Sequence, residues 1–169
     1  MSLSMYQVSV PLIGQMLGSL DAILDKAVAH CEAKKIAPEV LLGYRIAPDM
    51  HPLTRQVQMV SDQAKGVVAR LAGIEVPSFP DDEKTFADLK ARIAKTLTFV
   101  NSVAADKIDG SEDKEIVLKL GPTFEMKFSG QQYLLHFFMP NFYFHTSTAY
   151  NILRHAGVEI GKRDLMGKI

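Results

Sequence analysis

The sequence predicts an all-α fold, a single domain over residues 1–169 in which four long amphipathic helices share one core and a small β-hairpin is inserted between the third and fourth helices. Apolar residues recur at spacings of three and four over four long segments, whereas the period changes to two around a single Gly-Pro pair. A helix with one apolar face must bury that face against another element. The four helices are therefore expected to pack together as a four-helix bundle.

The first helix is predicted from Pro11 to about Lys34, with the proline in its first turn. The lone cysteine, Cys31, falls on its apolar face, where a thiol behaves as a small hydrophobic group. The apolar stripe consists of Ile13, Met16, Leu17, Leu20, Ile23, Leu24, Ala27, Val28 and Cys31.

The second helix is predicted to start at Pro52 and to stop before Gly73, a residue suited to a helix C-cap. The segment that joins it to the first helix contains two prolines and a glycine, which predict a short helical turn at 40–42 followed by an irregular crossover. The apolar face of the second helix consists of Leu53, Val57, Val60, Ala64, Val67, Val68 and Leu71.

The third helix follows a linker and is predicted to begin after Thr85, with Asp88 completing a variant of the capping box. Its apolar face consists of Phe86, Leu89, Ile93, Leu97, Val100 and Val103. Apolar residues then alternate in EIVLKL (115–120) and FEMKF (124–128), which predicts a hairpin with Gly121 and Pro122 at its turn.

The fourth helix is predicted over 131–155, although Pro140 lies inside it. Proline removes one backbone donor, so we expect the helix to kink or restart there. The tail after Gly157 is expected to run along the surface.

Charge and hydropathy limit the classes of partner and the location. Nineteen basic residues balance nineteen acidic ones, so no long-range field favours nucleic acid or an anionic membrane. The apolar runs are shorter than the roughly 20 residues that span a bilayer, and the amino terminus does not resemble a signal peptide. We expect a cytoplasmic protein with no nucleic-acid or membrane partner. We also expect a homodimer, because helical bundles of this kind often pair through their helix faces.

The most informative polar residues lie in the fourth helix. Asn141 and His145 are four residues apart and share one helix face, which Thr148 continues. This row could bind a metal ion, or it could be a buried network in which His145 is neutral and hydrogen-bonded. His51, before Pro52, could face a cleft at the start of the second helix or act as a surface or capping residue.

The segments RIAPDMHPLTRQVQ, RLAG, PNFYFHTSTAYNILRHAGV and GKRD, in this order with the hairpin, resemble a bacterial family of unknown function that is placed with the DinB-like and YfiT-like metalloenzymes. The resemblance covers essentially the whole chain. It implies a four-helix bundle that holds a divalent ion, often nickel or zinc, with one histidine from the second helix and an HxxxH pair on the fourth. Some members of this superfamily are thiol-dependent transferases or isomerases.

The resemblance implies a degenerate metal site in this sequence. The pattern puts His145 at the second histidine of the pair, Asn141 at the first and Gln58 at or near the ligand of the second helix. Two of three ligand positions therefore lack imidazole, which removes most of the coordination energy for a transition metal. The three residues could still line a polar pocket, with His51 or Asp62 as compensating ligands.

Two functions follow from this sequence. One is a non-catalytic bundle that binds a small ligand or a partner subunit and keeps the polar row as a buried network. The alternative, which the resemblance implies, is a metal-dependent hydrolase or thiol-dependent transferase of that superfamily, in which His145 binds a weakly held ion or acts as a general base. The sequence slightly favours the first.

Overall fold

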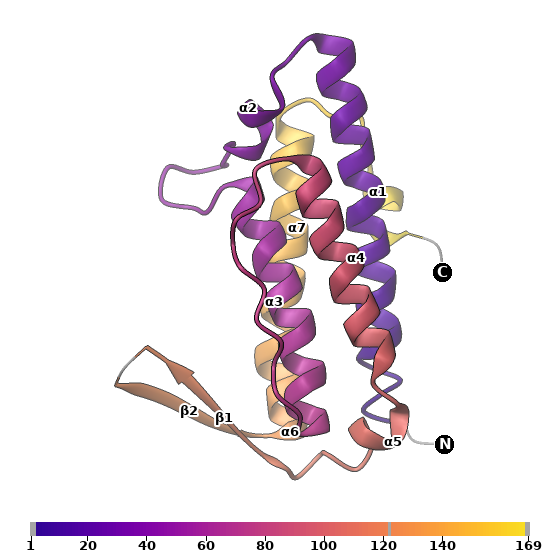
Figure 1. The fold of residues 1–169 in the computed structure, drawn as a ribbon, viewed down its shortest axis with the longest axis vertical. Helices are drawn as coiled ribbons and strands as arrows, with labels where there is room; N and C mark the ends of the chain where they lie inside the picture. The colour runs from indigo at the N-terminus through magenta and orange to yellow at the C-terminus, as the bar shows by residue number, and fades with distance from the viewer. Residues whose placement is uncertain (1–2, 122, 168–169) are drawn as a thin grey trace.

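The computed structural model describes residues 3–121 and 123–167 and is mostly helical, as the sequence predicts. Four long helices lie side by side (Figure 1). They are α1 (Val10–Lys34), α3 (Leu53–Ala72), α4 (Phe86–Ser102) and α7 (Met139–His155). The shorter helices are α2 (Pro38–Leu42), α5 (Ala105–Ile108), α6 (Gly130–Gln132), the π-helix Tyr133–Phe138 and α8 (Lys162–Met166). The helices α5 and α8 were not predicted, because elements of four and five residues are too short to show a period.

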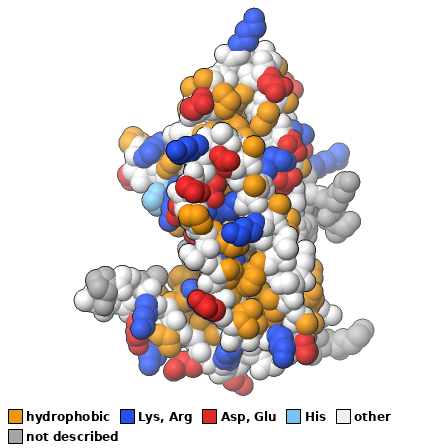
Figure 2. Space-filling model, viewed as in Figure 1, with side chains coloured by type: hydrophobic (Ala, Val, Ile, Leu, Met, Phe, Trp, Pro, Cys, Tyr) orange, Lys and Arg blue, Asp and Glu red, His pale blue; other side chains and the backbone are white. Residues whose placement is uncertain are grey.

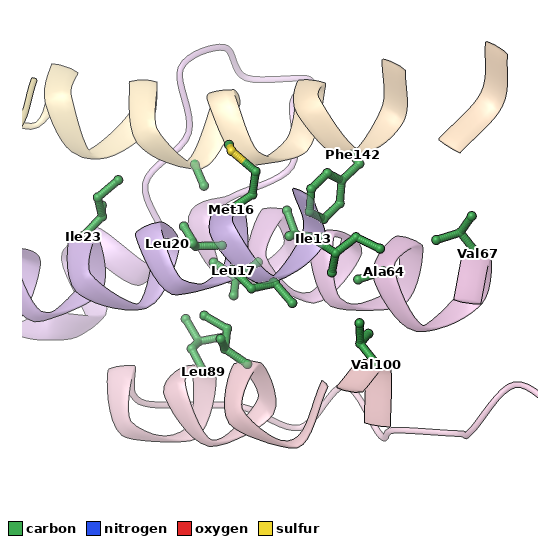
Figure 3. Packing of buried hydrophobic residues seen from close by; sticks show 14 of the residues in the cluster. Ile13, Met16, Leu17, Leu20, Ile23, Ala64, Val67, Leu89, Val100 and Phe142 are labelled. Carbon is green, nitrogen blue, oxygen red and sulfur yellow. The ribbon is translucent and has the colours of Figure 1, made fainter. Parts of the chain in front are cut away.

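The apolar stripes of the four long helices meet in one core (Figure 3). Leu17 of α1, Leu89 of α4 and Phe142 of α7 have no exposed side-chain surface. Cys31 is also buried at the core face of α1, and burial raises the pKa of its thiol. The predicted helix faces are therefore the faces that the structure buries.

Helices α3 and α4 run in the same direction, and the segment 73–85 returns along the length of α3 to connect them (Figure 1). Gly73 ends α3 with a φ of 72°, the left-handed conformation expected of a C-cap. Thr85 and Asp88 form the predicted capping box at the start of α4. Hydrogen bonds from the backbone N–H groups of Lys84 and Thr85 lower the pKa of the Asp88 carboxyl.

Arg92 of α4 holds this connecting segment in place. Its guanidinium is almost fully buried and donates to the Pro80 carbonyl at 2.9 Å and to Glu83 at 2.8 Å. Its other terminal nitrogen contacts Asp62 of α3 at 2.8 Å and Asp81 at 3.1 Å. One cation therefore joins two helices to the chain that crosses between them.

Pro140 lies near the start of α7, directly after the π-helix. At this junction the Met139 N–H donates to the Leu134 carbonyl, five residues earlier. The π-helix has more residues per turn than an α-helix, so it shifts the hydrogen-bond register just before Pro140, which has no N–H to donate. The helical path therefore changes its winding at the predicted break and then continues.

The hairpin joins β1 (Glu115–Leu120) to β2 (Phe124–Ser129), which pair antiparallel with Leu118 opposite Met126. It projects away from the long helices (Figure 1). Gly121 has a φ of 76°, which suits its predicted place in the turn. Pro122, the other predicted turn residue, lies outside the described residues.

Acidic and basic side chains are intermixed on the face shown in Figure 2, as the balanced composition suggests. In the described parts of the chain, no helix combines the length and the apolar character that crossing a membrane requires.

Candidate functional site

His145 projects from α7 toward the first turns of α3, and only 6% of its surface is exposed. Its Nδ1 atom lies 2.8 Å from Oε1 of Gln56. The Gln56 amide is oriented by its own Nε2, which donates to the His51 carbonyl at 3.0 Å. Because Oε1 can only accept, Nδ1 must carry the hydrogen, and the lone pair of a neutral ring is then on Nε2.

Burial keeps this ring neutral. Loss of solvation lowers the pKa of His145, and the nearby His51 and Arg55 lower it further. A neutral imidazole with hydrogen on Nδ1 is an acceptor of hydrogen bonds, or of a proton, at Nε2. The structure therefore fixes both the tautomer and the role of the remaining nitrogen.

The Nε2 atom of His145 has no hydrogen-bond partner among the described residues. Within the same part of the chain, the fully enclosed side-chain atoms that lack a partner are His30 Nε2, Arg92 Nε and Ser111 Oγ. His145 Nε2 is not one of them, so this atom keeps contact with solvent. A small molecule that reaches it can donate a hydrogen bond.

The side chains that accompany His145 on α7 are bound to their own helix. Asn141 Nδ2 donates to the Phe137 carbonyl at 2.7 Å, and Thr148 Oγ1 donates to the Phe144 carbonyl at 2.7 Å. Asn141 thus lies one turn from His145, as the sequence indicates, but the two side chains do not bond to each other.

The structure does not bring Gln58 to His145. Its Oε1 accepts from Arg55 at 3.2 Å, and its Nε2 donates to Glu83 at 2.8 Å, in the segment between α3 and α4. Two residues on a helix correspond to about 200°, so Gln56 and Gln58 face opposite sides of α3. Asp62 likewise contacts Arg92.

Gln56 is the partner that sequence reasoning missed. It lies three residues after Leu53 and four before Val60, both fully buried members of the apolar stripe. A polar residue inside such a stripe must find a buried partner, and that signal was available in the sequence.

The donors near His145 do not fit the nickel or zinc site that the resemblance implies. The Asn141 and Gln58 amides are engaged elsewhere, and His51 has an exposed side chain. Within 3–121 and 123–167, no three His, Cys, Asp or Glu side chains gather in a way that could hold a metal ion. A transition-metal site with three protein ligands would need at least three such donors.

Comparison with known proteins supports the fold. A crystal structure of a DinB family member protein from Shewanella denitrificans is similar to this chain, with a TM-score of 0.89 and 39% sequence identity over 97% of this chain and 92% of that one. No protein of curated function matches. Residues 5–166 match the model of a family described as a domain of unknown function, DUF1993. The chain therefore belongs to this uncharacterised DinB-like family.

Proposed function

We propose that this protein is a DinB-like four-helix bundle that binds a small molecule at His145, between α3 and α7. The ligand would present a hydrogen-bond donor to Nε2 and would lie against the aromatic surface of α7. The observation that supports this proposal most directly is the hydrogen bond between His145 Nδ1 and Gln56 Oε1, because it leaves Nε2 as a fixed acceptor.

The aromatic surroundings also support a small-molecule ligand. Phe144 is 54% exposed, and its ring makes an edge contact with His145 at a centroid distance of 5.1 Å. Tyr143, beside it, is 38% exposed. Apolar walls around a few fixed polar groups are typical of sites for small molecules.

A fragment screen by NMR would test the proposal. Compounds that bind at this site are expected to shift the ¹⁵N resonance of His145 Nε2 and to lose affinity in His145→Phe, which keeps an aromatic ring but removes the acceptor. His136→Phe is the matched control, since His136 is exposed on the preceding π-helix. A screen in which no compound shifts Nε2, or in which both variants bind equally, would contradict the proposal.

The second candidate is the metal-dependent hydrolase or thiol-dependent transferase. Its support is that ligating histidines commonly donate their other N–H to an oxygen acceptor, as His145 does to Gln56. Metal analysis of protein purified without chelator or a nickel column distinguishes the two functions. Stoichiometric metal that is lost in His145→Ala would favour the enzyme. Protein without metal, together with ligands at Nε2, would favour the binding function.

A further inference from the structure

The hairpin leaves strand edges uncovered. Its sheet contains only β1 and β2 among the described residues, so each strand pairs on one side and has an outer edge without a strand partner. The hairpin also projects away from the long helices (Figure 1). A strand added at its outer edge would therefore not collide with those helices. Unpaired N–H and C=O groups along an exposed edge are a template for another strand.

The two faces of the hairpin differ in chemistry. Directly paired residues point to the same face, so the pairs Ile116–Phe128 and Leu118–Met126 form an apolar face. The opposite face carries four charged residues around the exposed Val117, namely Glu115, Lys119, Glu125 and Lys127.

Only the base of the apolar face is covered. Ile116 and Leu118 are buried, and the Phe128 ring lies 5.6 Å from that of Phe137 on the π-helix, between centroids. Toward the tip, Phe124 is 57% exposed. An aromatic side chain next to an open strand edge gains most from a strand added at that edge.

The sequence of β2 is complementary to itself. Residues 124–128 read FEMKF, so an antiparallel copy centred on Met126 sets Glu125 opposite the partner's Lys127 and Phe124 opposite the partner's Phe128. A two-fold axis repeats both pairs, as in an isologous interface. Opposite charges and aromatic pairs directly across two strands both stabilise a sheet.

We propose that β2 pairs antiparallel with β2 of a second copy of this chain, around a two-fold axis at Met126, so that two hairpins form one four-stranded sheet. On the charged face, each Glu125 then lies between Lys119 of its own hairpin and Lys127 of the other copy, because Lys119 already lies opposite Glu125 within each hairpin. The apolar face becomes continuous from one copy to the other. This inference does not depend on the pocket at His145.

The other edge fits less well. β1 also has a self-complementary pattern, with Glu115 and Lys119 on either side of Val117. However, the apolar residues that this pairing would join, Ile116 and Leu118, are already buried within one chain. A partner strand at β1 would therefore remove little apolar surface from water, whereas a partner strand at β2 would cover the exposed side chain of Phe124.

An interface made by two five-residue segments, 124–128 of each copy, is short. Most stable protein–protein interfaces bury a larger accessible surface, roughly 800 Å² on each partner. We therefore expect a monomer–dimer equilibrium that depends on protein concentration. Sedimentation of the full chain over a wide concentration range would detect it. A chain that stays monomeric at the highest concentration overturns the proposal.

Charge reversal tests the partner strand. Glu125→Lys places like charges opposite each other at two positions of the dimer and should weaken it about tenfold or more. Lys127→Glu should do the same, and an equimolar mixture of the two variants should restore dimers, because each supplies the charge that the other lacks. Glu115→Lys, the matched control on β1, should leave the dimer unchanged. Loss of dimer in the control alone, or a mixture that stays monomeric, would refute pairing through β2.

An engineered disulfide tests the register. Directly opposite residues in antiparallel strands are close enough for a disulfide, so Met126→Cys should form a covalent dimer under mild oxidation. Val117→Cys, at the equivalent position of β1, should form less covalent dimer under the same conditions. The native Cys31 is buried and should not compete. Equal cross-linking of both variants, or preferential cross-linking at position 117, would overturn the assigned axis. Circular dichroism establishes that each variant is folded.

Discussion

At His145, burial is the main factor that opposes protonation, with further contributions from His51 and Arg55, so the pKa of the folded state lies below that of the unfolded chain, which is about 6.5. As the pH falls through that value, the unfolded chain takes up a proton that the folded chain does not. The free energy of unfolding must therefore decrease until the pKa of the folded state has been passed.

His145→Gln removes this titration. We expect the difference in melting temperature between wild type and this variant to change as the pH falls from about 8 to about 5, with the wild type losing relatively more stability. Thermal unfolding at several pH values measures the effect. Parallel curves for the two proteins would show that the imidazole is not held neutral.

Two neighbouring aromatic residues of α7 should respond differently to truncation. Phe142 is fully buried and stacks on Phe138 at a centroid distance of 5.1 Å, whereas Phe144 is 54% exposed. Phe142→Ala should lower the free energy of unfolding by about 3–5 kcal/mol, through lost contacts and a cavity. Phe144→Ala should cost less than about 1 kcal/mol. Urea denaturation measures the free energy of unfolding of both variants. Similar losses in the two would mean that Phe142 does not lie in the core while Phe144 faces solvent.

The site was only partly predictable at this scale. His145 stood out because an imidazole within an apolar helix needs a partner, and the structure supplies one. The sequence pointed to Asn141 on the same helix as a partner, and the resemblance pointed to Gln58 only as a metal ligand. The structure instead gives the hydrogen bond to Gln56, because the rotation of α3 turns Gln58 away.

Among the elements, the segment 73–85 depends on one buried cation. Arg92→Met would leave Glu83, whose side chain is only 8% exposed, without its main counter-charge. We expect a loss of about 3 kcal/mol in the free energy of unfolding, since removing one partner of a buried ion pair leaves the other uncompensated.

The control for this substitution is Lys90→Met on the same helix. Lys90 contacts Asp21 and Asp25 at 2.8 Å each, but its side chain is 29% exposed. Water screens such pairs, so the loss should stay below about 1 kcal/mol. Urea denaturation of both variants, with limited proteolysis of the segment, is the measurement. Equal losses would show that Arg92 is not a special anchor.

The long helices were predictable because each carries a regular apolar stripe, as in the run from Ile13 to Cys31 of α1. The path of the connecting segment was not, because it is set by contacts between residues far apart in sequence, such as Arg92 with Asp62. The π-helix was foreseen only as a disturbance at Pro140, since composition does not specify how a helix adjusts to a missing donor.

For the whole molecule, burial predicts where the chain opens first. Helices α1 and α3 carry fully buried residues along most of their lengths, whereas the hairpin tip has little covering. Amides of α1 and α3 should exchange hydrogen only through global unfolding, and those of β2 should exchange sooner in dilute protein. Exchange measured by mass spectrometry would show this difference. Equal protection at low concentration would contradict it.

The parallel course of α3 and α4 also affects the order of folding. Two helices joined by a tight turn can dock as soon as both form, but here the segment 73–85 must first run back along α3 (Figure 1). We expect α4 to dock after the rate-limiting step, so Leu89→Ala should accelerate unfolding in stopped-flow experiments while leaving the refolding rate almost unchanged. Refolding slowed in proportion to the lost stability would place α4 in the nucleus instead.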